Sequence, residues 1–360
     1  MPSRLLGTCA PKKNFRRTLL LGSVAASFVV VGGQEIFAQC APAAPVAGDT
    51  VTCSGAIVSG GFFSAVDDLT VVVDTGASFN PGGLSLRGSG TLTVTNKGSI
   101  NAASGTGIYV SAKTGGVGND VVINSSGTVS TGSGVSAKNF GSGYLSLVTA
   151  DITASRFDGI TTYLKQGTDL TIDATAGTVL AQRQGITSQN RGSGALSITT
   201  ANVTASSSSA ISAYSKGTTL SIDTSAGTVM GNSYGITGTN RGSGVLAITT
   251  ADVTSVTSTG IYAGNSGTEL TVNTTAGTIL GTRGISAGNL GSGAVNIIAA
   301  DVTGTTYAGI SVGNSGTDLT INSSAGTVIG NGLGIVGFNR GSGDFSITTA
   351  DVTSANGRGV

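Results

Sequence analysis

An internal repeat of about 25 residues predicts an all-β protein, a parallel β-helix (solenoid) of about eleven coils of 24–26 residues. Three observations lead to this class. Related strings return every 49 or 50 residues, a second family of strings lies half a period away, and each unit carries three short apolar clusters between turn residues. The first family is GTDLTIDATAGTV (167–179), GTTLSIDTSAGTV (217–229), GTELTVNTTAGTI (267–279) and GTDLTINSSAGTV (316–328). The second is GALSITTANVT, GVLAITTADVT, GAVNIIAADVT and GDFSITTADVT, which begin at Gly194, Gly244, Gly293 and Gly343.

Each unit is too short to bury its own apolar face. Its clusters of Val, Ile, Leu and Thr are separated by Gly, Ser, Asn and Asp, and no stretch shows the 3.6-residue period of a helix. Neighbouring units must therefore stack and share one core. At the ~4.8 Å spacing of paired strands, the coils would form a rod of roughly 50 Å. A propeller blade needs four longer strands and leaves no place for the half-period, so the β-helix is preferred.

Three ladders of β-branched residues are expected inside the coils, because stiff side chains suit a pleated wall. The alternating Thr, Ser and Asp residues then point outward. The first ladder is Ile172, Ile198, Ile222, Ile248, Val272, Ile297, Ile321 and Ile347. The second is Ile160, Ile186, Ile211, Ile236, Ile261, Ile285, Ile310 and Ile335. The third is Val179, Val203, Val229, Val253, Ile279, Val302, Val328 and Val352.

A further column consists of Asn residues, each followed by one residue and then Gly-Ser-Gly: Asn139, Asn190, Asn240, Asn289 and Asn339. Asn tolerates left-handed backbone geometry and bonds its own turn, which predicts a stacked corner. Arg191, Arg241 and Arg340 follow this column on alternate coils. We interpret them as solvated side chains, with a ligand-binding stripe as the alternative.

The amino terminus, residues 1–38, has the organisation of a secretory signal peptide. Five Lys and Arg residues between positions 4 and 17 precede an apolar run over residues 19–31, and cleavage is expected after Ala38. The apolar run is shorter than the about 20 residues of a membrane-spanning helix. The chain is therefore expected to be exported.

After the leader, residues 39–90 are expected to form an N-terminal cap and the first irregular coils. Residues 91–360 are expected to form the repetitive β-helix, which ends mid-coil. Cys40 and Cys53 remain after cleavage, and an even pair in an exported chain predicts a disulfide across a small loop. The alternative is a lipid anchor on Cys40, which is disfavoured because Gln39 stands where such an anchor needs a small residue.

Charged residues make up only 10% of the chain, which also contains 59 Gly and a large excess of Ser and Thr. A cytosolic enzyme usually carries about 25% charged residues. Residues 39–360 hold 13 Lys and Arg against 16 Asp and Glu, a net charge near −3. This composition favours an extracellular rod and predicts no attraction to nucleic acid or to an anionic membrane.

The basic leader, the mature start CAPAAPVAGDTVTCSG (residues 40–55) and the tandem Gly/Thr/Ser-rich coils resemble the passenger regions of bacterial type V autotransporters. The resemblance covers nearly the whole chain and is specific for architecture rather than for activity. It implies export to the periplasm of a Gram-negative bacterium, passage across the outer membrane with help from a C-terminal β-barrel, and adhesion or self-association at the cell surface. The expected partner is a surface receptor, a glycan or another copy of the chain.

The sequence departs from that family because about the last hundred residues are still repeat and carry no barrel strands. The outer-membrane barrel translocator expected from the resemblance is absent from this chain. The chain is therefore interpreted as a fragment or truncated form, which would be periplasmic if truly truncated. The predicted function is a non-catalytic, passenger-like rod for cell-surface adhesion or self-association. The alternative is a secreted β-helix enzyme acting on polysaccharide.

No catalytic, cofactor-binding or metal-binding residue is assigned. The chain contains no His, which excludes Ser-His-Asp and Cys-His catalysis as well as histidine metal sites. Residues 72–77, VVDTGA, resemble the catalytic turn of aspartic proteases, in which two Asp residues share a proton. The partner of Asp74 would be Asp223, in an Asp-Thr-Ser motif three coils along. A repeat turn explains that motif better.

Two acidic patterns remain. Residues 115–123, GGVGNDVVI, match the calcium-binding nonapeptide of parallel β-rolls, but one copy supplies only half of such a site, so no calcium is expected. A polysaccharide-active enzyme would use acidic residues that recur at one corner: Asp151, Asp252, Asp301 and Asp351, with Asn202 replacing one member. Their even spacing instead predicts a ladder that stabilises turns.

Overall fold

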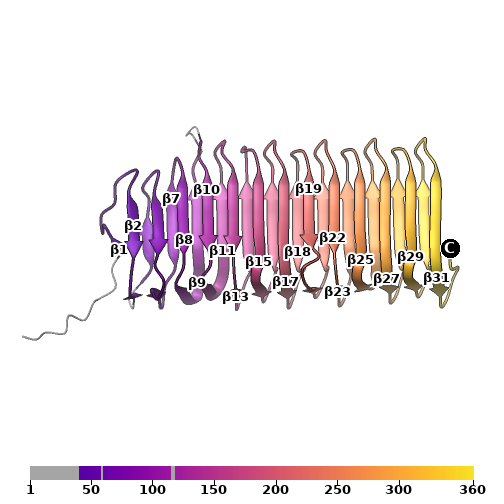
Figure 1. Ribbon diagram of the computed structural model, residues 1–360, viewed down its shortest axis with the longest axis horizontal. Helices are drawn as coiled ribbons and strands as arrows, with labels where there is room; N and C mark the ends of the chain where they lie inside the picture. The colour runs from indigo at the N-terminus through magenta and orange to yellow at the C-terminus, as the bar shows by residue number, and fades with distance from the viewer. Residues whose placement is uncertain (1–39, 58–59, 115–117) are drawn as a thin grey trace, which may run out of the picture. The chain divides into compact units, whose positions relative to one another are not determined.

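The computed structural model describes residues 40–57, 60–114 and 118–360. The predicted signal peptide and its cleavage position after Ala38 lie outside these ranges. The described chain is a parallel β-solenoid of about 12 turns with coils of about 25 residues (Figure 1). Within these ranges there is no helix, and so no helix that could cross a membrane. The predicted fold class is confirmed.

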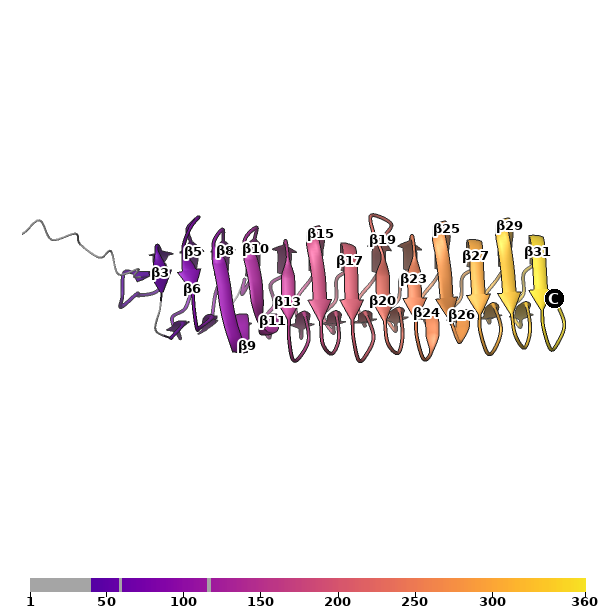
Figure 2. The same cartoon turned by 90° about the horizontal axis from the view of Figure 1, so that it is seen from below.

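Each coil places its strands on three faces, and the strands of successive coils pair in parallel within each face; Figures 1 and 2 show the solenoid from two directions. The first face contains β2 (Thr50–Cys53), β5 (Thr70–Val73), β8 (Leu92–Asn96), β10 (Val121–Ser125), β12 (Leu145–Thr149), β19 (Leu220–Thr224), β22 (Leu246–Thr250) and the first parts of β15 (Leu170–Ala181), β17 (Leu196–Ala205), β25 (Leu270–Gly281), β27 (Val295–Gly304), β29 (Leu319–Gly330) and β31 (Phe345–Ser354). The last six strands bend and continue on the second face.

The second face also contains β3 (Ala56–Ile57), β6 (Ser78–Phe79), β13 (Ile152–Ala154), β20 (Val229–Gly231), β23 (Val253–Ser255) and the first parts of β9 (Ser99–Ala112) and β11 (Thr128–Asn139). The third face contains the ends of β9 and β11 with β4 (Phe62–Ser64), β7 (Leu84–Gly88), β14 (Ile160–Leu164), β16 (Ile186–Asn190), β18 (Ile211–Ser215), β21 (Ile236–Asn240), β24 (Thr259–Asn265), β26 (Arg283–Asn289), β28 (Ile310–Asn314) and β30 (Ile335–Asn339).

The three predicted ladders form the core of the solenoid. Ile172 pairs with Ile198, and the register continues without a slip through Ile222 and on to Ile347. The residues of all three ladders are buried, except that Ile347 and Val352 in the last coil are partly buried. Because each coil repeats the same inward positions, the core is one continuous column of stacked aliphatic side chains.

The solenoid has about 12 turns rather than the predicted eleven. Two first-face strands, β2 and β5, precede the first recognisable repeat, with Val51 opposite Val71 and Val71 opposite Val94. Among the described residues the first face therefore has thirteen strands and the third face has twelve. β1 (Cys40–Ala41) runs antiparallel to β2, and Cys40 forms a disulfide with Cys53. The antiparallel strand occupies the open edge of the first coil, where further pairing would otherwise be possible.

The alternation between 24 and 26 residues arises at the corner between the first and second faces. Ala174 lies opposite Thr200 and Thr178 lies opposite Asn202, so three residues span this corner in one coil and a single residue spans it in the next. The same difference recurs between β25 and β27 and between β29 and β31. The two-tier repeat therefore reflects one longer and one shorter corner.

The predicted acidic ladder joins each short corner to the long corner of the next coil. Asp151 Oδ1 accepts a hydrogen bond from the backbone N–H of Thr178 at 2.9 Å, beside Gly177, where a Cβ would lie 2.8 Å from the same oxygen. Equivalent bonds join Asn202 to Thr228, Asp252 to Thr278 and Asp301 to Thr327. The turn-stabilising role is confirmed for these residues, but the bonds link coils in pairs and do not form an unbroken column.

The Asn column lies inside the solenoid, where the third strand ends. Asn240 Nδ2 donates to Asn265 Oδ1, and the chain of amides continues through Asn289, Asn314 and Asn339 at 3.1–3.3 Å. Each Oδ1 also accepts the N–H two residues later, as predicted for a stacked corner. The expected left-handed geometry is wrong, because among the described residues only Asp68 is a non-glycine residue with positive φ. The amides bond across coils instead, which needs no unusual backbone.

Candidate binding face

The outward positions of the three faces differ in chemistry. Those of the first face are Ser, Thr, Asn, Asp and small aliphatic residues, with no aromatic side chain among the described strands. The third face presents six outward rings that are exposed or half-buried: Phe63, Tyr109, Tyr163, Tyr214, Tyr262 and Phe338. A concentration of aromatic side chains on one face of a charge-poor protein is typical of a binding surface.

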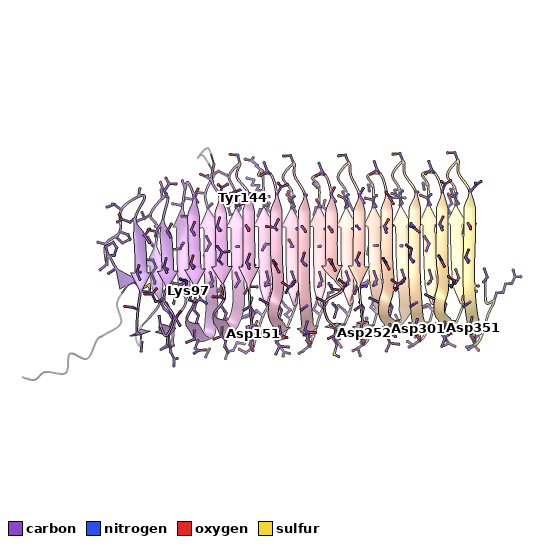
Figure 3. All side chains as sticks on the ribbon, viewed as in Figure 1. Lys97, Tyr144, Asp151, Asp252, Asp301 and Asp351 are labelled. Atoms are coloured by element: carbon purple, nitrogen blue, oxygen red, sulfur yellow. A yellow bond between two sulfur atoms is a disulfide. The ribbon has the colours of Figure 1, made fainter. Side chains whose placement is uncertain are left out.

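Cations gather on the same face and on its entry corner, the turn that precedes each third-face strand. Six Lys and Arg residues lie there: Arg87, Lys138, Arg156, Arg183, Arg283 and Arg358. Asp158 is the one acidic residue that the described chain places in this region. Four Asp residues instead follow one another along the corner between the first and second faces: Asp151, Asp252, Asp301 and Asp351 (Figure 3). On the third face and its entry corner, positive charge therefore outweighs negative charge, although the net charge of residues 39–360 is near −3.

The cations lie against the rings. The guanidinium of Arg87 is 4.8 Å from the ring centroid of Tyr109, and the Lys138 ammonium is 5.8 Å from the same centroid. Three further Arg–aromatic contacts of 5.4–6.0 Å join Arg183 to Phe157, Arg191 to Tyr163 and Arg283 to Tyr307. Such contacts stabilise by about 0.5–1 kcal/mol at exposed sites and hold the long side chains in place.

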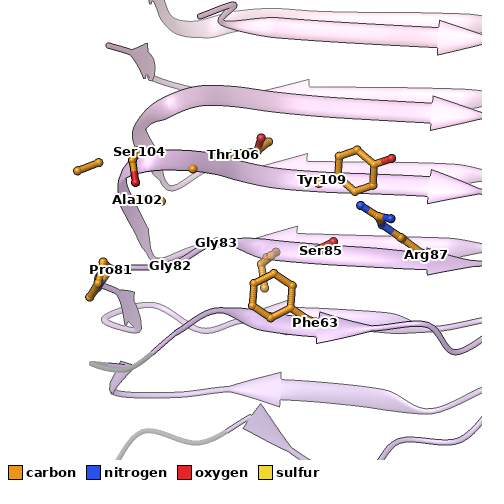
Figure 4. A pocket seen from close by; sticks show the side chains of 13 residues that line it. Phe63, Pro81, Gly82, Gly83, Ser85, Arg87, Ala102, Ser104, Thr106 and Tyr109 are labelled. Atoms are coloured by element: carbon orange, nitrogen blue, oxygen red, sulfur yellow. The ribbon is translucent and has the colours of Figure 1, made fainter. Parts of the chain in front are cut away.

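A hollow of about 540 Å³ opens on this face near the N-terminal coils (Figure 4). Small residues, among them Gly82 and Gly83, line it together with the rings of Phe63 and Tyr109. Gly82 and Gly83 are required by the fold, because a Cβ at either position would collide with a backbone carbonyl of the neighbouring coil. Phe63, which lines the same hollow, is 72% exposed.

A second hollow of about 450 Å³ shares Thr106 and Tyr109 with the first and extends to Phe157 and Arg183. Arg183 donates from Nε and Nη2 to the two carboxylate oxygens of Asp158, both at 2.6 Å. These hydrogen bonds, and then the charge of Asp158, raise the pKa of Arg183 above its ordinary value. The two hollows are adjacent, with Tyr109 lining both, and the only carboxylate lining the pair is already paired.

A third hollow, of about 370 Å³, lies farther along the same face between Tyr262 and Leu290. Gly264 and Gly288 are neighbours on its floor, and a Cβ at Gly288 would meet no atom within 4 Å. The fold therefore does not require glycine at position 288. An outward glycine of this kind keeps the surface bare beside the Tyr262 ring.

The Arg residues that follow the Asn column do not form a stripe of their own. All three are exposed, as the interpretation of solvated side chains requires. Arg191 lies 5.7 Å from the Tyr163 ring centroid, and Arg241 lines the third hollow, so two of them border the third face. Arg191 and Arg241 lie beside the aromatic residues Tyr163 and Tyr262, which are not part of the predicted stripe.

The protease-like and calcium-like motifs are built into turns. Asp74 directly follows β5 and Asp223 lies on β19, and six successive strand pairings rather than three coils separate these two first-face strands, so the carboxylates are too far apart to share a proton. Asp120 Oδ1 accepts the N–H of Tyr144, and Asn119 Oδ1 accepts that of Gly90. Residues 115–117 lie outside the described chain. In the part that the structure describes, no three Cys, Asp or Glu residues come together as a metal site would require.

The aromatic face is the feature that sequence reasoning missed. Its signal was present in the sequence, because Tyr109, Tyr163, Tyr214 and Tyr262 all stand one or three residues after the aliphatic residue that begins a third-face strand. The predicted ladders consist of inward residues, and the sequence pattern predicts Thr, Ser and Asp at the outward positions. Comparison of the chain with family models, with curated proteins and with solved structures found no match, so the structure establishes the fold and the resemblance to autotransporter passengers stays an expectation.

Proposed function

We propose that this chain is an exported, non-catalytic, passenger-like rod that mediates adhesion, and that its third face contacts a surface receptor or glycan. The observation that carries the proposal is the gathering of aromatic and cationic side chains on one face of a protein with only 10% charged residues. Aromatic and Arg side chains are enriched where proteins bind partners. A face repeated over many coils suits an extended ligand or many weak contacts.

Two further features support the export and the absence of catalysis in this proposal. The Cys40–Cys53 disulfide is consistent with an oxidising compartment outside the cytosol. The recurring carboxylates, which a polysaccharide-active enzyme would use as acid and base, accept backbone N–H groups at Thr178, Thr278 and Thr327. Those carboxylates are engaged in holding turns.

Self-association is a second candidate function, and the second face favours it. From β13 to β31, the outward residue of the second-face strands alternates from coil to coil between Thr and a large apolar residue. The apolar members, Leu180, Met230, Leu280 and Ile329, are 40–49% exposed. Two copies displaced by one coil, ~4.8 Å, would place the large residues of one against the Thr residues of the other. Sedimentation velocity of the protein and of Leu280→Thr tests this, and equal association by the two would contradict it.

The adhesion proposal is tested with beads coated with the purified protein. Beads coated with the wild-type protein are compared with beads coated with a variant. In the variant, Thr, which suits outward strand positions, replaces Phe63, Arg87, Tyr109, Lys138 and Tyr163. The expected result is adhesion of wild-type beads to cell surfaces or extracellular matrix and loss of most of that adhesion in the variant. The unfolding transition of both proteins is measured in parallel. A correctly folded variant that adheres as well as the wild type would contradict the proposal.

A further inference from the structure

Aromatic and cationic side chains alternate coil by coil along the N-terminal part of the third face. Successive strands β4, β7, β9, β11 and β14 present, in order, Phe63, Arg87, Tyr109, Lys138 and Tyr163. All five side chains are exposed or half-buried. The alternation of ring and cation repeats every two coils. The sequence alone does not show it, because the copies of the repeat are weak at this end of the chain.

Strand register converts this order into a spacing. Phe63 lies opposite Ser85, which lies opposite Tyr109, so the two rings stand in one column two coils apart. Arg87 and Lys138 stand in the adjacent column, also two coils apart and separated by Ser111. At the ~4.8 Å spacing of paired strands, each period is about 10 Å long. Rings and cations are therefore offset by one coil along the axis. Tyr163 continues this order along the axis but lies opposite Lys138, in the column of the cations.

We propose that this face binds an acidic polysaccharide whose disaccharide repeat carries a single carboxylate and whose chain runs along the solenoid axis. One coil is close in length to one pyranose unit of an extended polysaccharide, so a disaccharide matches the two-coil period. The apolar face of the uncharged sugar packs on an aromatic ring. The carboxylate of the next sugar pairs with Arg87 or Lys138. The planar guanidinium of an Arg side chain can donate two parallel hydrogen bonds to one carboxylate.

The geometry of the site agrees with this ligand. The first two hollows, of about 540 and 450 Å³, are adjacent on this face and share Thr106 and Tyr109, so one extended chain could contact both. Hydroxyl groups of Ser85, Ser104 and Thr106 line the first hollow and can exchange hydrogen bonds with sugar hydroxyls. The Tyr109 ring, 4.8 Å from the Arg87 guanidinium, helps to hold that side chain at the edge of the hollow.

Charge complementarity favours an anionic chain over a neutral one. Asp158, the only acidic residue lining these hollows, is paired with Arg183, and that pair is the only salt bridge within the described residues. Arg87 and Lys138 thus retain their charge for a ligand. The inference rests on the proposed function, since it names the ligand class of the same face.

The inference is tested by titrating the purified protein with hyaluronan oligosaccharides, in which glucuronate alternates with an uncharged amino sugar. Polygalacturonate, with a carboxylate on every sugar, and single-stranded oligo-dT are the comparison polyanions. Hyaluronan is expected to bind most tightly, because every second sugar of polygalacturonate would place a carboxylate on an aromatic ring. Equal or tighter binding of polygalacturonate or oligo-dT, or no binding of hyaluronan, would overturn the inference.

Two single variants locate the site. Arg87→Gln is expected to weaken hyaluronan binding about tenfold or more, as the loss of a charge-assisted hydrogen bond predicts. Arg340→Gln makes the same change of charge on an exposed residue far along the chain and is expected to leave binding within about twofold. Equal weakening by both variants would mean diffuse attraction and would overturn the site. Beads that still adhere while hyaluronan fails to bind would contradict the ligand class and leave the adhesion proposal standing.

Discussion

Replacing Asn265 by Ala tests whether the internal amide column stabilises the stack of coils. The Asn265 side chain is 2% exposed, and its Nδ2 donates to Glu269 O at 3.0 Å and to Asn289 Oδ1 at 3.2 Å. Its Oδ1 accepts from Gly267 N–H at 3.2 Å and from Asn240 Nδ2 at 3.1 Å. Truncation to Ala removes all four hydrogen bonds at once.

The magnitude follows from which partners are left unpaired. Asn240 Nδ2 keeps other acceptors, and Asn289 Oδ1 keeps the N–H of Gly291, whereas the N–H of Gly267 loses its partner inside the corner. An unpaired buried donor costs about 1–3 kcal/mol, and each lost hydrogen bond adds roughly 0.5–1.5 kcal/mol. Since the surviving partners recover part of this, the expected local loss is about 2–4 kcal/mol.

Native-state hydrogen exchange is the suitable assay, because long repeat arrays do not unfold in one step. A loss of about 2–4 kcal/mol should raise the exchange rate of the Gly267 amide roughly 30- to 700-fold. Asn265→Ser should show a smaller effect, since Ser215 in the same column accepts the N–H of Gly217 through its hydroxyl. Asn296→Ala is the control, because Asn296 points outward on β27. Equal exchange at Gly267 in the Ala variant and the control would refute the reasoning.

Three further predictions concern the core and the corners. Ile236→Asp should destabilise the protein by several kcal/mol, because a carboxylate would lie among stacked Ile and Val side chains. Thr237→Asp, at an outward position, should cost about 0.5 kcal/mol. Equal shifts in the thermal unfolding of the two variants would contradict the assignment of inside and outside. Thr274→Val should stabilise the protein or leave its unfolding unchanged, because the buried Thr274 hydroxyl has no hydrogen-bond partner among the described residues. Thr224→Val should destabilise it by about 1–2 kcal/mol, because it removes the 2.6 Å hydrogen bond between the Thr224 and Thr250 hydroxyls. A denaturation midpoint of Thr274→Val at or below that of Thr224→Val would contradict this prediction. Gly235→Ala should lower the melting temperature, because the added Cβ would overlap a valine methyl and lie 2.7 Å from a carbonyl oxygen; an unchanged melt would contradict this packing.

Position within a coil could be predicted from the sequence alone. The repeat returns Ile172, Ile198 and Ile222 at the same place in each unit, and a β-branched residue that recurs among polar neighbours has to point inward. The turn-forming role of Asn240 and of Asp252 followed in the same way, from side chains that bond nearby backbone. These properties depend on the chemistry of nearby residues and on the repeat period, and the sequence of the repeat unit contains both.

Relations between unlike coils were decided only by the tertiary structure. Asn265 and Asn314 join the amide column because every coil, and not every second one, stacks at that corner. The alternation of rings and cations from Phe63 to Lys138 became visible only when strand register placed weak repeats side by side. Sequence periodicity specifies where a residue lies in its own coil. Which side chain lies next to it across ~4.8 Å depends on pairing with a neighbour of different sequence, and that pairing forms only when the coils stack.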